Sequence, residues 1–344
     1  MATSIDQFMR EQLLDRRHKL EHAGQHADDS GHLQHLLEEV DSALARIDDG
    51  CYGFCESCHE TIECDRLIAD PLVRFCLDHL TRSERSALEA DLQLAKRVQT
   101  GLLPKENLDR DGWQICYHYE PAGMVSGDYC DVIDAGRNGL YFMVGDVSGK
   151  GVAASMLMAH LHAMFRTLIP VGLSLPCMLQ HANRVFREST LPNQYATLVA
   201  GRAWPDGRVE ICNAGHPPPL IVREGTVCAL ELSDLPIGLF GSEEFALIEL
   251  SLDCGHGLVI YSDGVSEATD SSGREYGADR LTGLIGQKQT LSASTLLAEC
   301  RDDLSKFTRN APKTDDVTLF VLGRTHSEAG YDSRAWSEDK RQFV

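Results

Sequence analysis

A series of short apolar runs begins at Trp113 and continues to the last quarter of the chain. Gly, Asn and Asp separate the runs, which include LYFMVGDVS, ATLVAGRAWPDG and DVTLFVLG. Such runs between turn residues predict β-strands and hairpins. Helical stretches interrupt them near residues 151–168, 176–190 and 293–309. Because strands outnumber helices and short turns join several of them, the sequence predicts an α+β sandwich of two largely antiparallel sheets flanked by helices.

The chain ahead of these runs has a helical pattern. Residues 5–20 predict a first helix, and apolar residues at helical spacing predict a second from about 32 to 48, ended by Gly50. A third stretch, 83–103, spaces its key positions by four and three and stops before Pro104. These positions are Leu88, Leu92, Ala95, Gln99 and Leu102. The short heptad pattern predicts a helical linker that is a candidate for pairing two chains as a homodimer.

Composition narrows the class of protein. The 344 residues are 43% hydrophobic, which suits one large domain and a smaller one. The net charge of -20 disfavours contact with nucleic acid or an acidic membrane. The first residues lack the pattern of a signal peptide, and no stretch approaches the ~20 apolar residues of a membrane span. We therefore expect a cytoplasmic protein that binds neither a membrane nor nucleic acid directly.

Carboxylates follow or precede several of the apolar runs. They are Asp128 and Asp131 in SGDYCD, Asp146 in VGDVSGKG, Asp263 in IYSDGVSE, and Asp315 and Asp316 in KTDDVTLF. A single Asp beside Gly at a strand end is more simply explained as a turn. Several strand ends can converge in a layered sheet, however, and carboxylate oxygens are the ligands that Mg²⁺ and Mn²⁺ prefer. The set therefore predicts a two-metal hydrolase that uses an activated water rather than a nucleophilic side chain.

The order of the motifs resembles the SpoIIE/RsbU-type branch of the PPM (type 2C-like) protein phosphatases. The resemblance covers about residues 90–323 and rests on SGDYCD, VGDVSGKGVAASMLMA, NAGHPPPLI, LPIGL, LVIYSDGVSEA, REYGADRL and TDDVTLFVL. It implies an αββα sandwich that hydrolyses phosphoserine or phosphothreonine on a protein. In this branch the usual substrate is a phosphorylated STAS-type anti-sigma-factor antagonist of a partner-switching pathway.

The same resemblance implies roles for individual residues. Asp146 is expected to bridge two Mn²⁺ or Mg²⁺ ions, one of which the backbone carbonyl of Val147 also binds. Asp263 and Asp315 are expected to complete the second metal site, and Asp128 is expected to support the first through water. The four aspartates are thus the expected catalytic residues.

Residues close to this set have less specific assignments. Asp316 stands where relatives in the wider superfamily carry Asn, so the resemblance does not assign Asp316 as a direct ligand. Lys150 in SGKG is a candidate contact for phosphate, and a surface lysine at a helix start explains it equally well. For Asn213 and His216 in NAGHPPP we favour a hairpin turn held by side-chain hydrogen bonds, and we assign no general-acid role to His216.

Cysteines crowd into the first quarter of the chain. Two residues separate Cys55 from Cys58, and two separate Cys76 from His79. Two such pairs, joined by a loop of this length, can close a tetrahedral shell around one structural Zn²⁺. Thiolates and an imidazole disfavour Mg²⁺ or Mn²⁺ here, and buried thiols without a metal are the alternative. The spare candidates, which lack the paired spacing, are Cys51, His59 and Cys64.

The surrounding pattern, from about residue 32 to 80, resembles the DksA/TraR-type zinc finger. His79 stands where that family usually carries Cys, which leaves tetrahedral zinc geometry intact. Members of the family bind RNA polymerase through a long helical hairpin with an acidic tip, whereas the hairpin expected here is short. RNA polymerase is therefore a weak candidate partner, and a structural or partner-sensing module is favoured.

We accordingly expect a chain of four segments. They are a helical zinc-finger domain (1–82), a helical linker (83–104), a phosphatase domain (105–324) and a flexible tail (325–344). The leading hypothesis is an active phosphatase. The alternative is a non-catalytic transcription or signalling regulator that uses the phosphatase fold as a scaffold, and a third possibility is that the zinc-finger domain gates the enzyme through the linker.

Overall fold

The computed structural model describes residues 4–24, 30–63, 66–67, 70–79, 82–192, 194–241, 244–287, 292–309, 311 and 313–325. The expected tail lies outside these residues from 326 onward. The chain divides into two compact units, Met1–Asp91 and Leu92–Val344, and each is considered by itself.

Two helices and a cysteine-containing loop form the first unit. Helices α1 (Ser4–Gly24) and α2 (Ser30–Asp48) pack together, and a 3₁₀ turn, η1 (Leu77–His79), precedes α4 (Arg82–Leu102). Gly50 follows α2 with a φ of 70°, a left-handed conformation that glycine adopts at low cost, so the helix ends there as predicted. The core of the unit includes Met9, Leu13, Val40, Ala43, Tyr52 and Ile62.

The second unit contains two antiparallel sheets. One has six strands in the order β1-β2-β11-β10-β7-β8, and the other has five in the order β3-β4-β5-β6-β9. The six strands are β1 (Asn107–Arg110), β2 (Trp113–Glu120), β11 (Val317–Arg324), β10 (Gly257–Tyr261), β7 (Leu220–Arg223) and β8 (Thr226–Ala229). The five are β3 (Asp128–Asp134), β4 (Leu140–Val147), β5 (Ala196–Ala203), β6 (Arg208–Ala214) and β9 (Ile248–Ser251).

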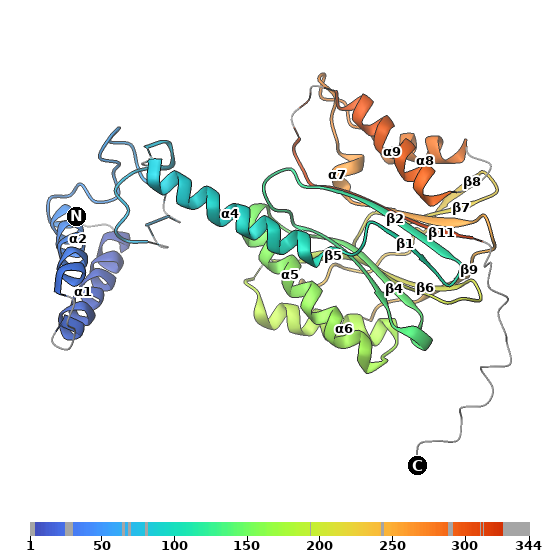
Figure 1. Cartoon of the computed structure of the whole chain (residues 1–344), viewed down its shortest axis with the longest axis horizontal. Coiled ribbons are helices and arrows are strands. Elements are labelled where there is room, and N and C mark those ends of the chain that lie inside the picture. Colours follow the sequence, from blue (N-terminus) through green and yellow to red (C-terminus); the bar gives the residue numbers. More distant parts are fainter. Residues whose placement is uncertain are drawn as a thin grey trace, which may run out of the picture. The chain divides into compact units, whose positions relative to one another are not determined.

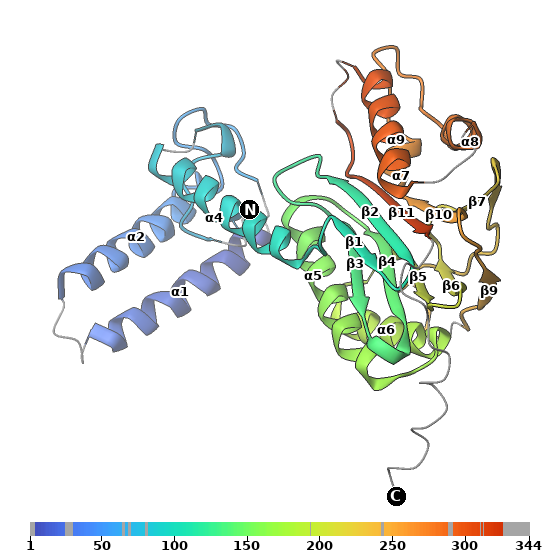
Figure 2. The ribbon, with the colours of Figure 1, turned by 45° about the vertical axis from the view of Figure 1, so that its right-hand side comes forward.

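Helices cover the outer face of each sheet (Figure 1). They are α5 (Gly151–Leu168), α6 (Leu175–Ser189), α7 (Asp263–Ser266), α8 (Ala278–Gly286) and α9 (Ala293–Phe307), with 3₁₀ turns η2 (Gly136–Asn138) and η3 (Ile169–Val171). Helices α5 and α6 pack on the five-stranded sheet, and α8 and α9 pack on the six-stranded sheet (Figure 2). Between the sheets, the rings of Phe142 and Phe320 stack with centroids 5.8 Å apart. The predicted αββα sandwich is confirmed.

The composition of helix α5 differs from the expectation about membrane-spanning stretches. Together with the turn that follows it, Gly151–Val171 is long and apolar enough by composition to cross a membrane, so the expectation that no stretch approaches a span is wrong. In the folded chain, Leu161 and Phe165 of this helix are buried against the five-stranded sheet. The apolar composition of α5 is thus that of a helix whose inner face belongs to the core.

Candidate functional site

Asp128 and Asp146 lie opposite each other on neighbouring strands. Strand β3 begins at Asp128, and the register of the β3–β4 pair places Asp146 directly across from it. Directly opposed residues project to the same face of a sheet. Asp128 is buried, and the hydroxyl of Thr318 on β11 donates a hydrogen bond to its carboxylate. Because β3 and β11 belong to different sheets, this bond joins the two sheets beside the carboxylates.

Asp263 and Asp315 come from the other sheet. Strands β10 and β11 are antiparallel neighbours, so the end of β10 lies beside the start of β11. Asp263 is the first residue of α7, soon after β10, and Asp315 lies just before β11. A Cβ at position 264 would lie 1.9 Å from the carbonyl oxygen of Asp316, so the chain requires Gly264 there. This close approach explains the Asp-Gly pair that the sequence suggested was a turn.

Burial and mutual repulsion raise the pKa values of these carboxylates. Burial, followed by the charges of Asp263 and Asp315, raises the pKa of Asp146 to about 7. Burial and the charge of Asp146 hold the pKa of Asp128 well above its usual range. Burial and the charge of Asp315 likewise raise the pKa of Asp263. The fold therefore brings the four predicted aspartates together as electrostatic neighbours, and a cation among them would relieve their repulsion.

The donor atoms at this place fit hard divalent cations. A Cβ on Gly127 would lie 3.0 Å from the carbonyl oxygen of Val147 and 3.3 Å from Oδ1 of Asp146, so both oxygens border the same small space. Carboxylate and carbonyl oxygens are what Mg²⁺ and Mn²⁺ require.

Asp316 uses both oxygens of its carboxylate on the loop that precedes Asp128. The N–H of Ala122 donates to Oδ1 over 2.7 Å, and the N–H of Gly127 donates to Oδ2 over 2.8 Å. These bonds make Asp316 a positioning residue for the loop. The sequence carried no signal for this role beyond the adjacency of Asp316 to Asp315.

Gln99 of α4 holds the same loop from another side. Its side-chain amide donates to the carbonyl oxygen of Ser126 over 2.7 Å and accepts from the N–H of Ser126 over 3.0 Å. Gln99 is 6% exposed, whereas its neighbours Leu94 and Val98 on the helix are 52% and 58% exposed. The heptad pattern included Gln99 as a seam position, but the structure uses it as a contact inside the second unit.

The structure places Lys150 beside the carboxylate group and Asp131 away from it. The ammonium of Lys150 lies 3.0 Å from Oδ2 of Asp315 and 2.6 Å from the carbonyl oxygen of Thr314, so it borders the carboxylate group. Asp131 lies three residues after Asp128 on β3, and successive side chains of a strand alternate between faces. Asp131 therefore faces α5, where Arg166 donates to both carboxylate oxygens over 2.6 and 2.9 Å. Asp131 and Arg166 thus form a structural ion pair outside the candidate site.

The NAGH segment forms a turn, as favoured from the sequence. The side chain of Asn213 accepts from the N–H of His216 over 2.9 Å and donates to its carbonyl oxygen over 3.0 Å. Burial lowers the pKa of His216 to about 3, so its imidazole is neutral at pH 7. Its Nδ1 lies 2.9 Å from Oγ1 of Thr197, the residue that pairs with Asp146 across β4 and β5. His216 thus supports the strand beside Asp146.

The first unit brings the predicted zinc ligands together. The ligand atoms of Cys55, Cys58, Cys76 and His79 all lie within 4.8 Å of one another. The sulfur of Cys76 is 3.7 Å from that of Cys58 and 3.3 Å from Nδ1 of His79. Burial opposes ionisation of Cys55, but backbone N–H groups, led by that of Cys76, lower its pKa to about 6. A soft, partly ionised set of this kind fits Zn²⁺.

Two of the spare candidates, Cys51 and His59, do not join this cluster. Cys51 is exposed, and its thiol contacts the carbonyl oxygen of Arg46 at 3.7 Å. His59 is not among the clustered ligands. Cys64 lies outside the described residues.

The fold and the carboxylate group define the class of protein as a PP2C-type, or PPM, phosphatase. The SiaA-PP2C domain of Pseudomonas aeruginosa shares the fold with a TM-score of 0.60 over 70% of this chain and 98% of that domain, at 17% identity. Residues 136–325 match the family described as Stage II sporulation protein E (SpoIIE). The chain belongs to this family, and it carries a serine/threonine phosphatase domain of the SpoIIE/RsbU type.

Curated relatives match the two parts of the chain separately. Protein IcfG of Synechocystis is 28% identical over 68% of this chain and 41% of its own length. Phosphoserine phosphatase RsbU of Bacillus subtilis is 26% identical over 72% of this chain and 74% of its own length. RNA polymerase-binding transcription factor DksA of Caulobacter vibrioides is 40% identical over 50 residues, 14% of this chain and 35% of its own length. The chain thus spans less than half of IcfG, and the DksA match together with the cysteine cluster confirms the DksA/TraR-type zinc finger.

Proposed function

We propose that this chain is an active, metal-dependent phosphatase that removes phosphate from phosphoserine or phosphothreonine of a protein. The observation that carries the proposal is the gathering of Asp128, Asp146, Asp263 and Asp315 at converging strand ends. Burial and repulsion raise the pKa values of the first three, which marks a place where negative charge exceeds positive charge. Family membership supports the same activity.

In this proposal, Asp146 and the carbonyl of Val147 would hold one Mn²⁺ or Mg²⁺ ion, and Asp146 would share in holding a second ion with Asp263 and Asp315. Asp128 would support the first ion through water. When bound, two such ions supply an activated water and neutralise charge on the phosphoryl oxygens.

The remaining work of the chain is to hold these groups in place. Asp316 fixes the loop at Ala122 and Gly127, and this loop sets the position of Asp128. Lys150, 3.0 Å from Asp315, is placed to contact a phosphoryl oxygen with its ammonium group. A nucleophilic side chain is not required.

For the substrate we propose a phosphorylated STAS-type anti-sigma-factor antagonist in a cytoplasmic partner-switching pathway. The resemblance to the SpoIIE/RsbU branch supports this choice, and RsbU is itself described as a phosphoserine phosphatase. The test measures phosphate release from phosphorylated STAS proteins at several Mn²⁺ concentrations. Release that requires Mn²⁺ is expected, and a protein that released no phosphate from any phosphoprotein with Mn²⁺ present would reject the proposal.

A second candidate function belongs to the first unit. Its DksA-like sequence and its cysteine–histidine cluster favour a zinc-dependent module that binds a protein partner, and RNA polymerase is one candidate because DksA is described as binding it. In this alternative the phosphatase fold is a scaffold. Mn²⁺-dependent turnover by the whole chain distinguishes the two functions.

Both functions can operate together if α4 gates the enzyme. Gln99 ties α4 to the loop before Asp128, and the exposed side chains of Leu94 and Val98 give the helix an apolar stripe that could pair two chains as a homodimer. The test compares the full chain with a chain that lacks residues 1–80. If neither oligomeric state nor turnover changes, the gating idea fails.

A further inference from the structure

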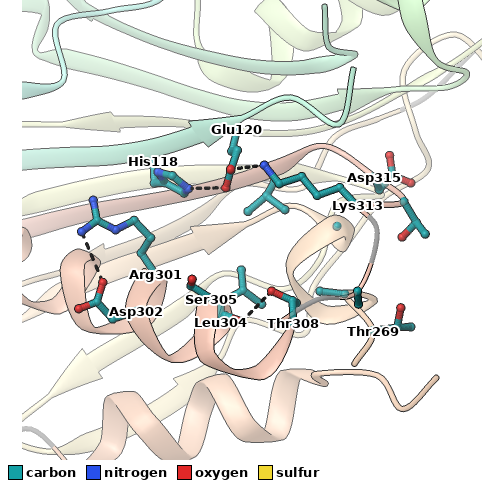
Figure 3. A pocket seen from close by; sticks show the side chains of 15 residues that line it. His118, Glu120, Thr269, Arg301, Asp302, Leu304, Ser305, Thr308, Lys313 and Asp315 are labelled. Carbon is teal, nitrogen blue, oxygen red and sulfur yellow. Dashed lines mark hydrogen bonds and ion pairs between the residues drawn. The ribbon is translucent and has the colours of Figure 1, made fainter. Parts of the chain in front are cut away.

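A cavity of about 310 Å³ opens beside Asp315 (Figure 3). Helix α9 forms one wall through Arg301, Leu304 and Ser305, and the end of β2 forms the opposite wall through Glu120. The loop that carries Asp315 and the first turn of α7 close its end. The cavity therefore shares a border with the candidate metal site. Of the residues proposed to hold metal, Asp315 is the one that lines the cavity.

The basic side chains that line this cavity differ in how closely they contact carboxylates. His118 lies 3.2 Å from Glu120, and the ammonium of Lys313 also contacts Glu120. Arg301 contacts Asp302, its neighbour in sequence, at 3.4 Å through Nη2. A guanidinium group has five N–H donors, and within the part of the chain that the structure describes this contact engages Nη2 alone. Arg301 is the cation of the cavity best able to accept a ligand.

A second cavity, of about 540 Å³, continues from the first. His118 and Arg301 line both, and the second cavity extends along β2 to Lys96 and Gln99 of α4. The two cavities together run from Asp315 to the carboxyl-terminal part of α4, with Arg301 at their junction. An extended peptide advances about 3.3–3.6 Å per residue, so a segment that leaves the metal site can follow this path.

We infer that the cavity beside Asp315 binds the segment of the phosphoprotein substrate next to its phosphorylated residue, and that Arg301 holds a carboxylate of that segment. The inference rests on the proposed phosphatase activity. A peptide is the fitting occupant because the cavity adjoins the site where its phosphate would lie and continues past it. A carboxylate is the fitting group because the guanidinium of Arg301 is positively charged and can donate a charge-assisted hydrogen bond to it.

The test uses two synthetic phosphoserine peptides and p-nitrophenyl phosphate as substrates of the full chain with Mn²⁺. One peptide carries Glu residues beside the phosphoserine, and the other carries Gln at the same positions. Arg301→Ala should lower the ratio of kcat/KM for the Glu peptide to kcat/KM for p-nitrophenyl phosphate about tenfold, which corresponds to one charge-assisted hydrogen bond. The ratio for the Gln peptide should change much less. Lys306→Ala, on the same helix outside the cavity, is the control and should change neither ratio.

A second variant tests the cavity itself. Ser305→Trp should fill it and lower the ratio for both peptides. Equal losses on both peptides with Arg301→Ala, or no loss with either variant, would overturn the inference. If the unaltered chain hydrolyses none of the three substrates, the proposed phosphatase activity fails instead.

Discussion

The side-chain amide of Gln99 bonds to both the N–H and the carbonyl oxygen of Ser126, two residues before Asp128. Replacement of Gln99 by Ala leaves both backbone groups of a buried segment without this partner, which costs about 1–3 kcal/mol. We predict that Gln99→Ala lowers the free energy of unfolding by that amount and weakens Mn²⁺ binding. Gln93→Ala, at an exposed position of the same helix, is the control. Equal urea midpoints and equal Mn²⁺ affinities for the two variants would contradict this role of Gln99.

Asp315 and Asp316 are neighbours with opposite expected effects. Asp316→Ala removes the acceptor for two backbone N–H groups, so we predict a loss of about 1–3 kcal/mol of stability in the metal-free protein. Asp315→Asn removes a charge that raises the pKa values of Asp146 and Asp263, so the metal-free protein should keep its stability or gain some. Urea unfolding with EDTA checks both. A larger loss with Asp315→Asn than with Asp316→Ala would show that the two roles are assigned the wrong way round.

The pKa of Asp146 predicts a pH dependence of metal binding. The carboxyl has a pKa of about 7 without metal, and a metal ion must displace its proton. Calorimetric titrations should therefore show Mn²⁺ affinity rising by about tenfold per pH unit below pH 7 and levelling off above it, if one proton is displaced. An affinity that is constant between pH 5.5 and about 7 would contradict the shift.

The same shift predicts the stability of the metal-free protein. The pKa of Asp146 in the folded protein lies above the value of about 3.9 for Asp in an unfolded chain, so the folded state holds the proton of Asp146 more tightly. The stability that this group contributes is present below about pH 4 and is lost as the pH rises toward 7. Relative to Asp146→Asn, which does not titrate, the unaltered protein should lose stability over that window in urea unfolding. A difference that stays constant with pH is the contrary result.

The zinc cluster makes a separate prediction for the first unit. Cys58→Ser removes one of four clustered ligands, so zinc content should fall from about one ion per chain to near zero, with loss of helical circular dichroism from this unit. Cys51→Ser removes an exposed thiol outside the cluster and should retain the ion. Equal zinc content in the two variants would mean that the cluster is not the binding site.

Much of the architecture was predictable because apolar runs and turn residues record it locally. The convergence of Asp128, Asp146, Asp263 and Asp315 was predictable only from their order, since each one alone is explained by a turn. Asp131 shows the limit of such patterns. It shares a motif with Asp128, yet the alternation of side chains along β3 sends it to Arg166.

The contacts that escaped prediction join residues far apart in sequence. The bonds from Asp316 to the loop at Gly127 and the contact of Gln99 with Ser126 depend on how the sheets and α4 pack. Local sequence carries no record of such packing. Arg301 is a similar case, because an exposed arginine on a helix has no visible role until the cavity beside Asp315 is formed.

Whether the chain is a metal-dependent phosphatase is tested by comparing Mn²⁺-dependent phosphate release by the unaltered chain with that of Asp146→Asn. Asp253→Asn, which removes an 85% exposed carboxylate elsewhere on the surface, is the matched control. We predict that Asp146→Asn lowers kcat/KM by about a hundredfold or more, because it removes the proposed bridging ligand, while Asp253→Asn leaves kcat/KM unchanged. Phosphate release by Asp146→Asn at the rate of Asp253→Asn would contradict the proposed role of Asp146 in a metal-dependent phosphatase.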